Sequence, residues 1–285
     1  MLIIVFPLMV FAQPVLSLTK LRDLLYQSHP QQVVRYRDDL GEGKGSFDFD
    51  PRMDWSKVNC TTWWQQLLAK SYAHNDREEL ETLDRIRYYD GVVGFSTRKH
   101  FLDRALLLDP QPFLDIASMD IPACTTDVQR MVRLDLSLFS TRKGFSCPLY
   151  REEVDEISFQ YFSPNALLQC VPHIPAGVYM IFPVASIRYN EIWGKESGPM
   201  GRVHGLFLDK EGTYAQVFHA SITKKKVVTT SLQKYVESLD AALFDGYQLY
   251  QISSTISPSQ PFRAHEEAIS CEQRMIKKNT QPITP

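Results

Sequence analysis

The chain has 285 residues, enough for one large domain or two small ones with a substantial core. It is 44% hydrophobic and 22% charged, with a formal net charge of -2. This near-neutral balance excludes a polybasic nucleic-acid-binding protein, and the one basic cluster, Lys224-Lys225-Lys226, is predicted to be a solvated strand end.

Residues 1–18 are predicted to be a secretory signal peptide. Residues 2–11 form an almost wholly apolar run that is too short to span a bilayer, and a cut is possible between Ala12 and Gln13. No Lys or Arg precedes Lys20, so the positive region of such signals is missing, and a buried strand is the alternative. We therefore expect a secreted or periplasmic protein without stable membrane insertion after signal removal.

Helices dominate the predicted structure of the first hundred residues. Apolar residues at helical spacing predict helices over residues 17–27, 61–72 and 77–88. Asp90-Gly91 reads as a turn. The pattern weakens over residues 106–172, where short strands are predicted over residues 128–138 and 157–161.

The second half reads as β-structure. Strands are predicted over residues 177–183, 203–208, 214–219, 227–229 and 247–252. A loop containing Trp193 is predicted over residues 186–201, and a helix capped by Ser231 over residues 231–238. Early helices and a late antiparallel sheet predict an α+β fold. We expect one domain over residues 19–256, and residues 257–285 as a tail that is either flexible or wrapped over the surface.

Cys60 is placed where a thiol becomes reactive. It follows a turn-rich run and begins the helix that carries Trp63 and Trp64. Backbone N–H groups and the helix dipole at this position favour the thiolate, which is the nucleophilic form. The competing interpretation is a small buried residue packed against the tryptophans.

The other cysteines bear on that interpretation. The chain also contains Cys124, Cys147, Cys170 and Cys271, and no pair has the C-x-x-C spacing of a zinc ribbon. In an exported protein, an odd count favours one free thiol with up to two disulfides among the other four. The sequence leaves all three pairings open.

Two histidines are predicted to lie on one sheet face. With a four-residue connection over residues 210–213, His204 faces His219 across an antiparallel hairpin. His204 can then take the proton of a thiol while His219 orients its ring, as in a catalytic triad. A polar surface pair and a zinc site with Cys60 are the alternatives, although no fourth ligand suggests itself.

The chain resembles the papain-like NlpC-type cell-wall peptidases, in the branch described as N-acetylmuramoyl-L-alanine amidase-like. The matching segments are Cys60-Thr61-Thr62, residues 86–91 (IRYYDG), residues 98–101 (RKHF), residues 174–177 (IPAG), residues 204–209 (HGLFLD) and residues 217–221 (VFHAS). Three features depart from the pattern: Asn59 stands where Asp is usual, Gly205 follows His204, and the long spacing implies an insertion over about residues 105–170.

The resemblance implies a papain-like fold, with N-terminal helices packed on an antiparallel sheet or barrel. It implies Cys60 as nucleophile, His204 as base and His219 as orienting residue, with Arg98, His100 and Trp63 expected to bind substrate. A structural hydrogen-bonded pair is the alternative for Arg98 and His100.

The implied activity is cleavage of the N-acetylmuramoyl-L-alanine bond of peptidoglycan or muropeptides in the bacterial cell envelope. The acyl-enzyme would be a thioester, with no cofactor and no metal. The alternatives are cleavage between γ-D-glutamate and the diamino acid, a non-catalytic cell-wall-binding protein, and an acyltransferase. No nucleic-acid partner is expected, and the oligomeric state is open.

Overall fold

The structure is a computed structural model. It describes residues 15–27, 35–36, 52–100, 114–115, 124, 126, 128–135, 154–197, 201, 203–255 and 269–274.

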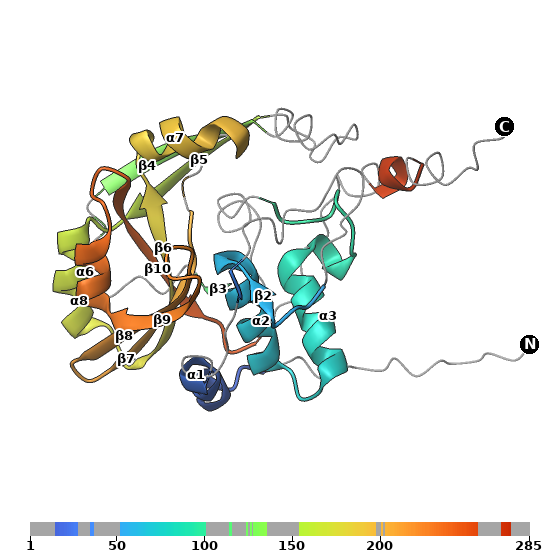
Figure 1. Ribbon diagram of the computed structural model, residues 1–285, viewed down its shortest axis with the longest axis horizontal. Helices are drawn as coiled ribbons and strands as arrows, with labels where there is room; N and C mark the ends of the chain where they lie inside the picture. Colours follow the sequence, from blue (N-terminus) through green and yellow to red (C-terminus); the bar gives the residue numbers. More distant parts are fainter. Residues whose placement is uncertain are drawn as a thin grey trace, which may run out of the picture.

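A six-stranded sheet with the order β3-β10-β6-β7-β8-β9 forms the centre of the fold (Figure 1). Its strands are β3 (Leu114–Asp115), β6 (Gly177–Ala185), β7 (Leu206–Glu211), β8 (Tyr214–Ser221), β9 (Lys226–Ser231) and β10 (Phe244–Ile252). All neighbouring strands in this sheet pair antiparallel. The five strands predicted in the second half of the chain are therefore all present.

Helices pack on both faces of this sheet (Figure 1). One face carries α1 (Leu18–Gln27) and α2 (Cys60–Tyr72), with α3 (Asp76–Arg87) packed on α2. The other carries α6 (Pro164–Cys170) and α8 (Leu232–Ser238), joined to the sheet by η3 (Val171–His173) and by the Ser231 cap. This arrangement confirms the predicted α+β class.

A separate antiparallel ribbon lies at one end of the sheet, within the predicted insertion. It consists of β4 (Val128–Asp135) and β5 (Val154–Tyr161). Apolar side chains of the ribbon pack with Phe95 and Val184 in a third core cluster. The Arg130 guanidinium also contacts Asp245 at 2.9 Å, which ties the ribbon to β10.

The prediction of a loop over residues 186–201 was wrong, because α7 (Ile187–Ser197) occupies most of this segment. The Ser186 hydroxyl accepts a hydrogen bond from the Tyr189 N–H at 3.1 Å and so stabilises the first turn. Gly194 lies within α7, where a helix tolerates glycine at a modest cost. Trp193 lies in the helix and not in a loop.

The ends of the described chain pack against the fold. Leu16 donates its N–H to the Ser254 carbonyl at 2.7 Å, and Val15 forms a bridge with Thr255. The proposed signal-peptide cut precedes these contacts, and residues 1–14 lie outside the described residues. Short elements complete the fold: β1 (Arg35–Tyr36), β2 (Lys57–Val58) and η1 (Tyr89–Gly91). None of the helices described is both long and apolar enough to traverse a bilayer.

Cys60, at the start of α2, forms no disulfide, whereas other cysteines of the chain do. Cys124 and Cys170 are joined, with their Cα atoms 5.1 Å apart, and Cys271 is also disulfide-bonded. Among the described cysteines, Cys60 is the one that forms no disulfide. Its sulfur therefore remains a thiol, as a cysteine nucleophile requires.

Candidate active site

The start of α2 is fixed by a reciprocal pair of hydrogen bonds. The Asn59 side chain accepts from the Thr62 N–H at 2.8 Å, and the Thr62 hydroxyl accepts from the Asn59 N–H at 2.9 Å. This capping box leaves Cys60 as the first helical residue, partly exposed. Asn59, the departure noted in the sequence, therefore caps the helix as Asp would, because both provide a side-chain oxygen acceptor.

The two histidines contact each other directly. His204 Nε2 lies 2.9 Å from His219 Nδ1, and the rings meet edge to face with centroids 5.0 Å apart. The predicted register was wrong by two residues, since Glu211 pairs with Tyr214 and Phe207 with Phe218. A shift of two residues keeps every side chain on its face of the sheet, so the histidines meet as diagonal neighbours.

Gly205 brings the first histidine close to α2. A Cβ at Gly205 would lie 2.5 Å from Cδ1 and Nε1 of Trp64 and 3.2 Å from Cε1 of Phe182. Trp64 is four residues after Cys60 and hence on the same side of the helix. The absence of a side chain at Gly205 therefore lets the backbone beside His204 pack directly under the turn that carries Cys60.

Burial keeps both imidazoles neutral. Desolvation, together with the nearby His219, lowers the pKa of His204 well below its usual 6.5. Desolvation lowers the pKa of His219 in the same direction. A neutral imidazole can accept a proton, so the pair has the protonation state that a general base requires at neutral pH.

Two tyrosines share the electrostatic environment of the thiol. Burial and the nearby Cys60 raise the pKa of Tyr189. Burial, Tyr247 and Cys60 raise the pKa of Tyr235. The Tyr235 ring also meets the His219 ring with centroids 5.1 Å apart. Cys60, Tyr235 and His219 therefore lie in one neighbourhood, formed by α2, α8 and β8.

Sequence reasoning assigned neither tyrosine to the site. Tyr235 is buried on α8. Its proximity to His219 depends on how α8 packs across the sheet, and no local pattern encodes that. Tyr189 lies in the segment predicted as loop, so no sequence signal marked it.

The three predicted substrate-binding residues have different environments. Trp63 is 1% exposed and packs edge to face on Phe207, which argues against direct contact with substrate. Arg98 is 3% exposed, and its guanidinium lies over the Tyr88 ring at 5.6 Å. His100 Nε2 lies 2.8 Å from the Phe95 carbonyl oxygen, and its ring packs on the Phe95 ring.

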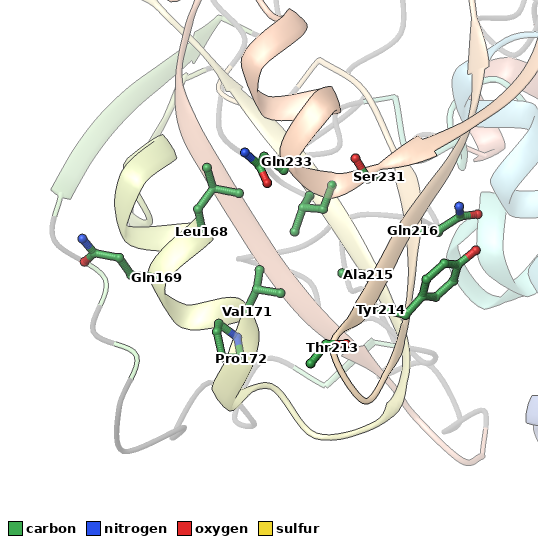
Figure 2. A pocket seen from close by; sticks show the side chains of 11 residues that line it. Leu168, Gln169, Val171, Pro172, Thr213, Tyr214, Ala215, Gln216, Ser231 and Gln233 are labelled. Atoms are coloured by element: carbon green, nitrogen blue, oxygen red, sulfur yellow. The ribbon is translucent and has the colours of Figure 1, made fainter.

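A pocket of 520 Å³ lies elsewhere, between η3 and the start of α8 (Figure 2). Its lining includes Leu168, Val171, Ala215 and Leu232 and contains no Cys, His, Asp, Glu, Lys or Arg. Its hydroxyl groups, on Thr213, Tyr214 and Ser231, therefore have no histidine, lysine or carboxylate in the lining to act as their base. Within the described ranges, no cluster of three or more His, Cys, Asp or Glu side chains is arranged to hold a metal ion.

Comparisons with known proteins point to one family. The family model described as AmiA-like, N-acetylmuramoyl-L-alanine amidase-like, matches residues 34–177. This match spans Cys60 and the segment containing Arg98 and His100, and it ends where β6 begins. No curated protein matches the chain.

Solved structures share the fold at low sequence identity. A Legionella pneumophila protein assigned to the family model DUF1460 is 16% identical, with a TM-score of 0.65 over 85% of this chain and 90% of that chain. A structure titled as an N-acetylmuramoyl-L-alanine amidase from Bacteroides uniformis is 16% identical, with a TM-score of 0.56 over 82% and 99%. A putative xylanase from Bacteroides fragilis is 18% identical, with a TM-score of 0.52 over 76% and 95%.

Proposed function

The chain belongs to the N-acetylmuramoyl-L-alanine amidase-like family, and from this membership we propose that it is a cysteine-dependent peptidoglycan amidase. The observation that carries the cysteine mechanism is the 2.9 Å contact between His204 and His219, beside the helix that begins at Cys60. We further propose that residues 19–256 form a papain-like catalytic domain. The protein would act as a secreted or periplasmic enzyme, after removal of residues 1–18 or a shorter N-terminal segment.

The tautomers of the histidine pair set the direction of proton transfer. When His204 Nε2–H donates to His219 Nδ1, the lone pair of His204 resides on Nδ1. That nitrogen takes the proton of the Cys60 thiol as sulfur attacks the substrate carbonyl. His219 fixes this tautomer and the ring orientation, the role of the third member of a triad.

The reaction then proceeds in two balanced steps. Sulfur forms a bond to the carbonyl carbon, and the backbone N–H of Cys60 at the start of α2 is the proposed donor to the developing oxyanion. His204 returns its proton to the leaving amine as the C–N bond breaks, which leaves a thioester on Cys60. Water, deprotonated by His204, hydrolyses that thioester and restores the thiol.

The proposed scissile bond joins N-acetylmuramic acid to L-alanine. The description of the family and the name of the Bacteroides uniformis neighbour support this choice. The alternative bond, between γ-D-glutamate and the diamino acid, uses the same residues and the same steps. The two differ only in which carbonyl lies over Cys60.

Digestion of purified peptidoglycan and of a soluble muropeptide, with products identified by mass spectrometry, tests the proposal. We expect free stem peptide beginning at L-alanine, and none from Cys60→Ala. His204→Ala should lose activity to a similar extent. His173→Ala is the matched control, because His173 is exposed on η3.

Each other result has a distinct meaning. Release of muramoyl-L-alanyl-D-glutamate would move the cut to the γ-glutamyl bond and keep the mechanism. Full activity in Cys60→Ala would overturn the cysteine mechanism. No product from the wild-type protein, with Cys60 still alkylated by iodoacetamide at low pH, would favour an acyltransferase. An unreactive Cys60 without product would favour a cell-wall-binding protein.

A further inference from the structure

The C-terminal part of the chain contributes a buried carboxylate to the catalytic domain. Residues 269–274 are helical, and Glu272 is 7% exposed. Its carboxylate accepts hydrogen bonds from the Phe95 N–H at 2.9 Å and from the Ser96 N–H at 3.0 Å. The Ser96 hydroxyl donates a third. At least this part of the predicted tail therefore wraps onto the domain.

The segment that receives Glu272 is shaped for a carboxylate. A Cβ at Gly94 would lie 3.1 Å from Glu272 Oε2 and 3.3 Å from the Thr97 hydroxyl, closer than most side-chain carbons pack. Two successive backbone N–H groups and a hydroxyl converge on the same two oxygens. A buried carboxylate without such donors would be strongly destabilising, whereas charge-assisted hydrogen bonds of this kind are among the stronger ones. Glu272 therefore fixes the backbone at residues 95 and 96.

This backbone orients His100. The Phe95 carbonyl lies 2.8 Å from His100 Nε2, and it belongs to the same planar peptide unit as the Ser96 N–H that donates to Glu272. The Phe95 and His100 rings also pack together, with centroids 4.4 Å apart. The position of the His100 ring hence depends on the backbone that Glu272 holds.

The same segment is connected to the helix that begins at Cys60. The Lys99 N–H donates to the Arg87 carbonyl at 2.9 Å. Arg87 Nε in turn donates to Gln65 Oε1 at 2.9 Å, and Gln65 lies five residues after Cys60 on α2. Two hydrogen bonds, both made by Arg87, therefore connect residue 99 to the second turn of the helix that begins at Cys60.

A second route leads to the thiol from the other side. Phe95 belongs to the same core cluster as Val184, near the end of β6. Two residues later, the Ser186 hydroxyl accepts from the Tyr189 N–H at 3.1 Å. Tyr189 lies on α7, and burial and the nearby Cys60 raise the pKa of its phenol. The segment held by Glu272 is thus linked to α2 through Arg87 and shares a core cluster with the end of β6.

We propose that Glu272 is a positioning residue of the active site, which holds the backbone of residues 95 and 96 and through it orients His100, a predicted substrate-binding residue. This rests on the proposed function, because the substrate of His100 is the one proposed for Cys60. The disulfide at Cys271 ties the adjacent residue covalently, so the carboxylate is presented by a restrained segment. Loss of Glu272 should loosen substrate binding more than it slows the chemical step.

The test compares Glu272→Gln and Ser96→Ala with Gln273→Ala, an exposed neighbour on the same helix. In the full chain we expect Glu272→Gln to raise KM for a soluble muropeptide about tenfold or more, with kcat changed by about twofold at most. Ser96→Ala removes one of three donors and should give a smaller rise. Gln273→Ala should match the wild type. Amide hydrogen exchange at Phe95 and Ser96 should be faster in Glu272→Gln than in the wild type, and unchanged in Gln273→Ala.

Binding measured in a Cys60→Ala background separates this inference from the proposed function. There, Glu272→Gln should weaken muropeptide binding by the same factor, whether or not the wild-type protein cleaves peptidoglycan. A lower melting temperature with unchanged KM and unchanged binding would reduce Glu272 to a structural residue and overturn the inference. A wild-type protein that binds muropeptide but does not cleave it would overturn the proposed function alone. A wild-type protein that neither binds nor cleaves muropeptide, with Cys60→Ala also failing to bind, would overturn both.

Discussion

Gly205→Ala tests how the histidine hairpin is held against the nucleophile helix. The added methyl would lie 2.5 Å from Cδ1 and Nε1 of Trp64, a buried ring that packs on Phe182. Favourable carbon contacts lie at about 3.5–4.0 Å, so the ring or the hairpin must move by about 1 Å. Trp64 is on the same side of α2 as Cys60, and Gly205 adjoins His204, so this movement separates the two proposed catalytic groups.

The two expected consequences differ in size. Overpacking of this kind costs about 1–3 kcal/mol of unfolding free energy, or about 2–12 °C in melting temperature for a large domain. A displacement of about 1 Å between reacting groups costs about 100-fold in rate. We therefore expect Gly205→Ala to remain folded at 25 °C but to lose about 100-fold in kcat/KM on a soluble muropeptide.

Gly212→Ala is the matched control. Gly212 has a φ of +55°, and a methyl group added there would meet no atom within 4 Å. Alanine at this position therefore costs about 1–2 kcal/mol of backbone strain without displacing a neighbour. Gly212 lies in the β7–β8 turn, at the opposite end of the hairpin from His204. Equal losses of activity in the two variants, or full activity in Gly205→Ala, would refute the proposed link between this contact and the site.

Three further predictions follow from the site. Burial lowers the pKa of both His204 and His219, so below about pH 6.5 the unfolded chain binds more protons than the folded one. The unfolding free energy, measured by urea titration, should therefore fall as the pH drops from 7 towards 4. A variant with both histidines changed to glutamine should show a smaller fall. Asn59→Ala should lower the unfolding free energy by about 1 kcal/mol in the same assay, whereas Asn59→Asp should preserve it, because only the former removes the acceptor for the Thr62 N–H. Activity should survive incubation with EDTA followed by gel filtration and be abolished by iodoacetamide, and the reverse pattern would indicate a metal-dependent enzyme.

The elements of the fold were accessible from sequence because their signals are local. Apolar spacing and the Ser231 cap predicted α1, α2, α3 and α8 to within one or two residues. The hairpin register was wrong because the tight turn at Gly212 uses fewer residues than predicted. The prediction that His204 and His219 lie on one face of the sheet is nevertheless confirmed, because side chains alternate with a period of two and the register error was two residues.

The remaining features depend on contacts between distant segments. Glu272 meets Phe95 across 177 residues of sequence, and Tyr235 reaches His219 only through the packing of α8. Trp63 was expected to bind substrate, yet its side chain is buried in the core. The catalytic roles of Cys60, His204 and His219 stay predictions, supported by their placement.

Hydroxylamine trapping of the acyl group on Cys60 tests the central claim most directly. A thioester intermediate partitions between water and hydroxylamine, so a soluble muropeptide should yield the hydroxamate of its acyl fragment, in rising proportion with hydroxylamine and not at all in Cys60→Ala. The mass of that hydroxamate identifies the bond: a muramoyl hydroxamate for the amidase, a muramoyl-L-alanyl-D-glutamyl hydroxamate for the γ-glutamyl cut. Cleavage that yields only the free acid at every hydroxylamine concentration, and that persists in Cys60→Ala, would contradict the cysteine mechanism.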